Sequence, residues 1–189
     1  MTHIYLVRHG PTHAKSMVGW SDLPADLSDT DALARLDAYL PNDAVVISSD
    51  LSRTIATADA IQKDRPRLDH DANLREMYFG DWELKTYTEV EDQEHIRAFW
   101  DNPGNVRPPN GESWNDVCAR VNTAIDRLIL THSGKNIIIV AHFGVIITQI
   151  QRALSLTGYE AFGHKIDNLS VTDIRIEENW QVGKINHVS

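Results

Sequence analysis

Ile4-Tyr5-Leu6-Val7-Arg8-His9-Gly10-Pro11 is the stretch of sequence that decides the fold. Its four apolar residues lead directly into an arginine, a histidine and a Gly-Pro pair. This order predicts a strand over residues 4–7 that ends in a tight loop carrying charged side chains. A strand of this kind is buried, so its polar end delivers Arg8 and His9 to the edge of a sheet.

Two later apolar runs end in the same way. Residues 44–47 are followed by Ser48-Ser49-Asp50, and residues 136–141, rich in Ile and Val, are followed by His142-Phe143-Gly144. We expect a serine or the aspartate of the first segment to cap the helix that follows it.

Helical patterns separate these runs, and a pair of strands follows them. The apolar spacing predicts helices over residues 28–40, 51–62, 112–131 and 145–154. The tail predicts strands over residues 169–176 and 180–185, joined by a turn. Strands that alternate with helices indicate an α/β fold, a three-layer α/β/α sandwich with a mainly parallel central sheet.

The chain length predicts one domain over residues 1–189. Residues 77–111 are rich in aromatic residues, Pro and Asn, and we expect an irregular excursion there, over one end of the sheet. The aromatic residues in and beside it are expected to pack in the core more than to line a substrate pocket; they are Phe79, Trp82, Trp100 and Trp114.

Composition restricts the partners and the location of the protein. The net charge of −9 argues against nucleic acid and anionic membrane as partners, because both require a basic face. A small phosphorylated substrate stays compatible, since it needs only a few local cations. Cys118 is the single cysteine, which excludes an internal disulfide, and we find neither an export signal nor a spanning segment. We therefore expect a cytoplasmic protein.

The polar groups at the strand ends predict an anion site. Ligands of open α/β sheets bind at the carboxyl ends of the strands, where Arg8-His9, the segment from Ser48 to Arg53, and His142 all fall. A buried guanidinium needs an anionic partner, and its planar fork matches phosphate oxygens. Neighbouring guanidiniums also keep the imidazole of His9 neutral and nucleophilic. The alternative is that Arg8 pairs with a carboxylate and His9 is an ordinary core histidine.

Five segments in order resemble the histidine phosphatase superfamily, whose members are phosphoglycerate-mutase-like. The resemblance extends over about residues 3–155, and five segments in the correct order are far more specific than one. They are Arg8-His9-Gly10-Pro11-Thr12, Ser48-Ser49-Asp50-Leu51-Ser52-Arg53-Thr54, Leu74-Arg75-Glu76-Met77 with Phe79-Gly80-Asp81-Trp82-Glu83, Pro109-Asn110-Gly111-Glu112-Ser113, and Val140-Ala141-His142-Phe143-Gly144-Val145.

The resemblance implies a role for each central residue. His9 attacks phosphorus and becomes phosphohistidine, while Arg8, Arg53 and His142 hold the equatorial oxygens. Glu76 serves as the acid and then the base, with Asp81 and Glu83 as nearby rivals. An ordinary glutamate is ionised at neutral pH, so Glu76 needs a raised pKa. Bound phosphate pushes in that direction and the arginines oppose it, so we expect a competent acid only with substrate present.

Three further residues complete the predicted substrate site: Thr12, Lys15 and Gly144. Lys15 stands where the family commonly carries an asparagine, and it either contacts phosphate or points outward. The stretch over residues 25–31 also departs from the family pattern.

The choice of substrate stays open at this level. The short chain resembles the branch that contains α-ribazole-5'-phosphate phosphatases rather than phosphoglycerate mutases proper. A generic sugar-phosphate or nucleotide monoesterase, a phosphoprotein (phosphohistidine) phosphatase and a non-catalytic phosphate-binding protein are the alternatives. A metal-dependent hydrolase is disfavoured, because the nine histidines show no paired ligand spacing. We expect neither a metal nor a cofactor.

Overall fold

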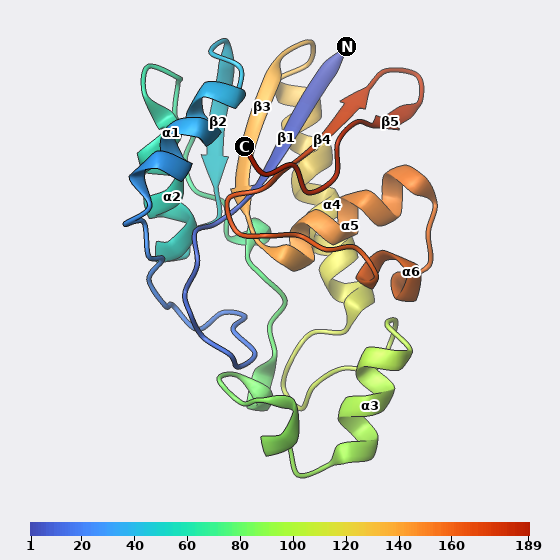
Figure 1. The fold of residues 1–189 in the computed structure, drawn as a ribbon. Helices are drawn as coiled ribbons and strands as arrows, with labels where there is room; N and C mark the ends of the chain where they lie inside the picture. The colour runs from blue at the N-terminus through green and yellow to red at the C-terminus, as the bar shows by residue number, and fades with distance from the viewer.

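The computed structural model describes residues 1–189 and contains one five-stranded sheet. The strands are β1 (Thr2–Arg8), β2 (Ala44–Ser48), β3 (Asn136–Ala141), β4 (Val171–Ile176) and β5 (Trp180–Val182), in the spatial order β2-β3-β1-β4-β5 (Figure 1). The first three strands are parallel, β4 runs antiparallel to β1, and β5 runs antiparallel to β4. The predicted mainly parallel sheet is confirmed.

The register of the parallel strands brings their polar ends together. Arg8 is paired with Ala141, and Ser48 is paired with Val140. His9, Ser49 and His142 therefore follow their strands at the same edge of the sheet. This convergence results from topology, since the three strands are far apart in sequence.

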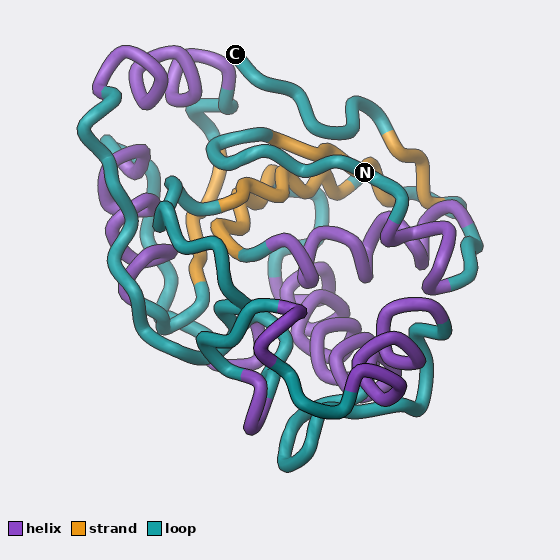
Figure 2. The backbone as a smooth tube through the Cα atoms, turned by 60° about the horizontal axis from the view of Figure 1, so that its bottom comes forward, coloured by secondary structure: helices purple, strands orange, loops and turns teal.

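Helices cover both faces of the sheet. Helices α1 (Thr30–Tyr39) and α2 (Ser52–Gln62) cover one face, and α4 (Trp114–Thr131) and α5 (Phe143–Leu154) cover the other. The short α6 (Gly158–Phe162) follows α5, and α3 (Gln93–Asp101) lies away from the sheet (Figure 1). In Figure 2 the strands lie between two groups of helices. The sheet with a layer of helices on each face confirms the predicted α/β/α sandwich.

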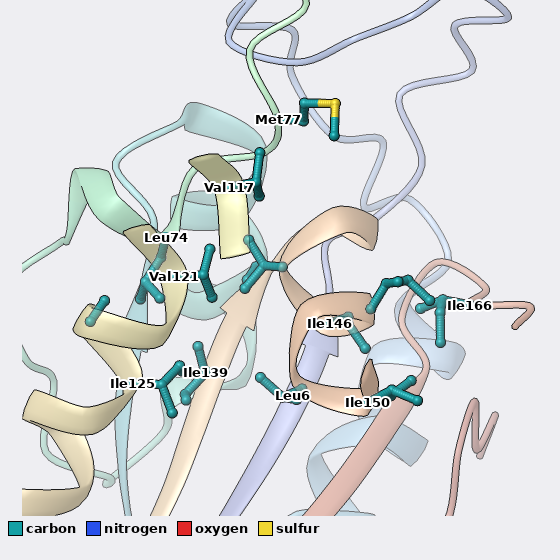
Figure 3. Close-up of a cluster of buried hydrophobic side chains, with 14 of the residues drawn as sticks. Leu6, Leu74, Met77, Val117, Val121, Ile125, Ile139, Ile146, Ile150 and Ile166 are labelled. Carbon is teal, nitrogen blue, oxygen red and sulfur yellow. The ribbon is translucent and has the colours of Figure 1, made fainter. Parts of the chain in front are cut away.

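Alternation along the strands builds two cores. On one face, residues of α1 and α2 such as Leu36 and Ile61 pack with Val46 and Ile138. On the other face, α4 and α5 pack against the side chains of β1 and β3 that point the opposite way (Figure 3). Burial of each such aliphatic side chain stabilises the fold by about 1.5–3 kcal/mol.

The excursion over residues 77–111 is less irregular than predicted. It contains α3 and two short 3-10 helices, Gly80–Trp82 and Tyr87–Glu89. Asp92 caps α3 by accepting a hydrogen bond from the backbone of His95, a signal present in the sequence. The excursion lies beyond the carboxyl ends of the parallel strands, where α3 is seen in Figure 1.

Other sequence predictions need small corrections. The predicted cap of α2 is wrong, because Leu51 precedes that helix and no side chain caps it. The tail strands are shorter than predicted, at Val171–Ile176 and Trp180–Val182. None of the helices combines the length and apolar character needed to cross a bilayer.

Candidate active site

A cavity of about 260 Å³ lies at the carboxyl end of β1, between the loop that follows this strand, α2, α5 and the excursion. It brings together four of the predicted site residues that carry charge or a titratable ring: Arg8, His9, Arg53 and Glu76. The remaining wall consists of Thr12, Ala14, Ser16, Met17, Val18, Phe79, Trp100 and Phe143. A larger cavity of about 450 Å³, between α1 and the C-terminal residues, contains none of the predicted site residues.

His9 is held as a neutral ring with one free nitrogen. Its Nδ1 lies 2.7 Å from the carbonyl oxygen of Gly10. A carbonyl only accepts, so Nδ1 carries the proton and Nε2 keeps its lone pair. Burial, together with the smaller effects of Arg53 and Arg8, lowers the pKa of His9 to about 3, against the opposing effect of that hydrogen bond. The direction agrees with the sequence argument, although burial is the larger cause.

Arg8 and Arg53 are anchored by backbone carbonyl groups rather than by carboxylates. Arg8 donates from Nη1 to the carbonyl of Ile166 at 2.6 Å. Arg53 donates from Nη1 to Ser21 at 2.8 Å and from Nη2 to Gly19 at 2.6 Å. The Nε atoms of both arginines are buried without a partner. A buried N–H group without an acceptor is costly, so the pair of guanidiniums is suited to an anion.

His142 lies behind His9 and does not line the cavity. The ring centroids are 5.2 Å apart, and the side chain of His142 is fully buried. Its Nε2 shares a hydrogen bond of 2.8 Å with the hydroxyl of Ser49, which in turn lies 2.6 Å from the hydroxyl of Thr54. Nδ1 has no partner. Burial, followed by the effect of His9, lowers the pKa of His142 well below its usual range.

Glu76 is a buried carboxyl group that lines the cavity. Its side chain accepts hydrogen bonds from the backbone N–H groups of Met77 and Gly144, each at 3.0 Å. Burial raises the pKa of Glu76, and these N–H groups together with Arg53 and Arg8 oppose the rise. Burial therefore favours the acid form before any substrate binds, a cause that the sequence argument did not include.

The two rival carboxylates are engaged elsewhere. Asp81 is exposed and accepts hydrogen bonds from the side chain of Asn110. Glu83 accepts hydrogen bonds from three successive backbone N–H groups, those of Gly19, Trp20 and Ser21. Neither carboxylate lines the cavity.

We call residues 17–21 the strap, since this segment crosses the excursion and carries the carbonyl groups that anchor Arg53. Met17 and the segment after Glu83 exchange two backbone hydrogen bonds, at 2.8 and 2.9 Å. A Cβ on Gly19 would lie 2.1 Å from the carbonyl oxygen of Met77, so only glycine fits there. Sequence reasoning missed the strap, because its residues show neither periodicity nor a charge pattern.

The remaining predicted residues have different places. Thr12 lines the cavity, as expected for a substrate-binding residue. Lys15 is exposed and outside the cavity, so the outward alternative describes it. Gly144 does not line the cavity either; its N–H group holds Glu76, and a Cβ there would lie 2.3 Å from Glu76 Oε1. The absence of a side chain at Gly144 leaves room for the carboxyl group of Glu76.

Two of the aromatic residues expected in the core contribute to the cavity wall. Phe79 and Trp100 line it, whereas Trp82 and Trp114 are buried elsewhere. No group of three or more His, Cys, Asp or Glu side chains lies in an arrangement that suits a metal ion.

Comparisons with known proteins agree with this geometry. The family model of the histidine phosphatase superfamily (branch 1) matches residues 4–187. The chain is 30% identical to the adenosylcobalamin/alpha-ribazole phosphatase of Salmonella typhimurium, over 96% of this chain and 94% of that protein. Among solved structures, Bacillus stearothermophilus YhfR superposes with a TM-score of 0.91 at 28% identity, covering 100% of this chain and 98% of the other. The alpha-ribazole phosphatase of Shigella flexneri superposes with a TM-score of 0.84 at 27% identity, covering 99% and 97%.

Proposed function

This chain belongs to the histidine phosphatase superfamily, and from that premise we propose that it hydrolyses phosphomonoesters through a phosphohistidine formed on His9. Phosphatase activity on small phosphorylated metabolites is the coarse function that its named relatives share. The observation that carries the finer proposal is the convergence of a neutral imidazole, the half-buried guanidinium of Arg8, the buried guanidinium of Arg53 and a buried carboxyl group on one small cavity.

In the first half-reaction, the lone pair on Nε2 of His9 attacks phosphorus while the bond to the leaving oxygen breaks. The hydrogen bond from Nδ1 to Gly10 supports this assignment, because it directs the lone pair to the other nitrogen and stabilises the positive charge that the ring acquires. A pKa of about 3 means that the ring is available as a nucleophile at neutral pH.

Charge builds on the three equatorial oxygens during transfer, and we propose that Arg8, Arg53 and His142 stabilise it. The unpartnered Nε atoms of the two arginines are donors that an oxyanion would satisfy. The unpartnered Nδ1 of His142 is a donor in the tautomer whose Nε2 accepts a hydrogen bond from the hydroxyl of Ser49. These donors are held in place before substrate arrives.

Glu76 is the proposed proton donor. Its raised pKa favours the protonated form, which gives its proton to the leaving oxygen. The resulting carboxylate then takes a proton from water, the water oxygen attacks phosphorus, and the bond from phosphorus to His9 breaks. A single carboxyl group thereby serves both half-reactions, and neither step needs a cofactor.

For the substrate, we propose α-ribazole 5'-phosphate. The support is that the Salmonella relative and the Shigella structure, which match almost the whole chain, are both named for alpha-ribazole phosphatase activity. The test is a comparison of kcat/KM across α-ribazole 5'-phosphate, sugar phosphates and nucleoside monophosphates. A sugar phosphate or a nucleotide as the best substrate would reject this assignment.

The nucleophile is tested by His9→Ala, with His13→Ala as the matched control. His13 lies on the same loop, is exposed and pairs with Asp26 outside the cavity. We expect a folded His9→Ala protein without measurable turnover of 4-nitrophenyl phosphate, and a control with wild-type turnover. Comparable turnover by the His9 variant, or loss of turnover on treatment with a chelator, would reject the mechanism.

A further inference from the structure

The part of the cavity that surrounds the leaving group is mostly apolar. In-line transfer places the leaving group on the side of phosphorus opposite His9. Beyond the phosphate-binding residues, the cavity is lined by six apolar side chains: Ala14, Met17, Val18, Phe79, Trp100 and Phe143. The polar groups on this wall are the uncharged hydroxyls of Thr12 and Ser16.

The aromatic residues of this wall form a connected group. Trp100 lies 6.1 Å from Phe79 and 5.7 Å from Phe162, measured between ring centroids. Phe162 in turn lies 6.5 Å from Phe143, so rings of the excursion, α6 and α5 support one another. Contacts of this kind hold the rings in fixed orientations and favour flat apolar ligands.

The cavity offers few cations to a second anionic group on the substrate. Arg8 and Arg53 are the only cationic side chains that line the cavity. The transferred phosphoryl group occupies both arginines, so no cation remains for a carboxylate or a further phosphate.

We propose that the site selects phosphomonoesters whose leaving group is uncharged and carries an aromatic or apolar ring, and that it discriminates against phosphorylated acids and bisphosphates. This inference rests on the proposed phosphatase reaction and specifies its substrate class. A second anionic group would lose water at an apolar wall without gaining a partner, which penalises binding. The cavity of about 260 Å³ is slightly smaller than common ligand pockets, which span about 300–1,000 Å³.

Matched substrate pairs test the selection against charge. 3-(Hydroxymethyl)phenyl phosphate and 3-carboxyphenyl phosphate release phenols of similar acidity, so chemistry at phosphorus is nearly constant. We expect kcat/KM to favour the uncharged member by about 10- to 100-fold, as for a charged group left unpaired on burial. Equal values for the two would overturn the inference, although the proposed hydrolysis itself would stand. Turnover of neither would instead reject the phosphatase reaction.

A single introduced cation tests the same claim from the opposite direction. Ser16 is half-buried on the wall, and Ser16→Lys supplies a partner for an anionic leaving group. We expect the preference for the uncharged substrate to fall at least about fivefold, because a charge-assisted pair replaces an unpaired group. Lys15→Ala is the control, since Lys15 is exposed and outside the cavity, and it should leave the ratio unchanged. If the ratio of the two kcat/KM values changed in Lys15→Ala and not in Ser16→Lys, the placement of Ser16 beside the leaving group would be wrong.

A second pair of substrates tests the preference for an aromatic leaving group. Benzyl phosphate and propyl phosphate differ in the ring, and kcat/KM should favour the benzyl ester. Trp100→Leu keeps an apolar side chain at the wall and should reduce that preference while leaving inhibition by inorganic phosphate unchanged. An unaltered preference in the folded variant would show that Trp100 does not contact the leaving group.

Discussion

Glu83→Gln should weaken phosphate binding although Glu83 does not line the cavity. Its carboxylate accepts hydrogen bonds from the backbone N–H groups of three successive strap residues. Two strap carbonyls in turn accept hydrogen bonds from the two terminal nitrogens of Arg53. Glutamine retains one acceptor oxygen and turns an NH2 group toward a backbone donor. One hydrogen bond from the strap is lost if the amide nitrogen takes the place of Oε2, and two are lost if it takes the place of Oε1.

The size of the effect follows from these bonds. A hydrogen bond to a charged acceptor is worth about 1.5–3 kcal/mol, so loss of one should lower kcat/KM by about 10- to 100-fold. The same change should raise the inhibition constant of inorganic phosphate, because Arg53 loses its fixed orientation. Exposed Glu89, which caps a 3-10 helix in the same excursion, is the matched control, and Glu89→Gln should leave both values unchanged.

A double-mutant cycle with Arg53→Ala decides whether Glu83 acts through Arg53. If it does, Glu83→Gln has little further effect once the guanidinium is gone, and the coupling energy is most of the single-mutant loss. Additive losses in the two backgrounds, or an unchanged inhibition constant in a folded Glu83→Gln protein, would refute the reasoning.

Three further variants test the protonation and hydrogen bonding of site residues. Glu76→Gln should lower kcat/KM for alkyl phosphates by about 10²–10⁴-fold, and much less for 4-nitrophenyl phosphate, whose leaving group needs no proton; an equal loss on both would exclude acid catalysis. Because burial raises the pKa of Glu76 above its unfolded value near 4.5, stability falls as pH rises past that value, so Glu76→Gln should raise Tm at pH 7 and lose this advantage in acid. Conversely, His9 has a pKa of about 3 against 6.5 when unfolded, so its neutral form contributes stability that declines as pH falls from 6.5 toward 3; urea unfolding of His9→Ala should show a smaller acid-induced loss than wild type. Ser49→Ala removes the hydroxyl partner of His142 and should lower kcat by about tenfold without loss of secondary structure, whereas wild-type kcat would show that this hydrogen bond is dispensable.

Much of the fold could be predicted because its signals are local. The Ile and Val run of residues 136–141 predicts a strand, and the structure has β3 at the same bounds. The apolar stripe of α4 likewise predicts that helix to within two residues at its start. Position at the strand ends was enough to predict that His9 and His142 meet, because parallel strands share one edge.

The parts that could not be predicted depend on contacts distant in sequence. Ser49 was expected to cap α2, but its hydroxyl group bonds to His142, a residue 93 positions away. Glu83 was a candidate acid, and only the folded strap shows that both of its oxygens accept hydrogen bonds from backbone N–H groups. Lys15 offered a cation next to the nucleophile loop, yet nothing local determines which side of that loop faces the cavity.

Trapping the intermediate tests the proposed mechanism most directly. The protein is incubated briefly with a radiolabelled phosphomonoester, quenched in alkali and digested, and the labelled peptide is sequenced by mass spectrometry. We predict a phosphoramidate on His9, stable in alkali and labile in acid, that is absent from His9→Ala. Label on a serine or an aspartate, or steady turnover without any labelled protein under single-turnover conditions, would contradict it.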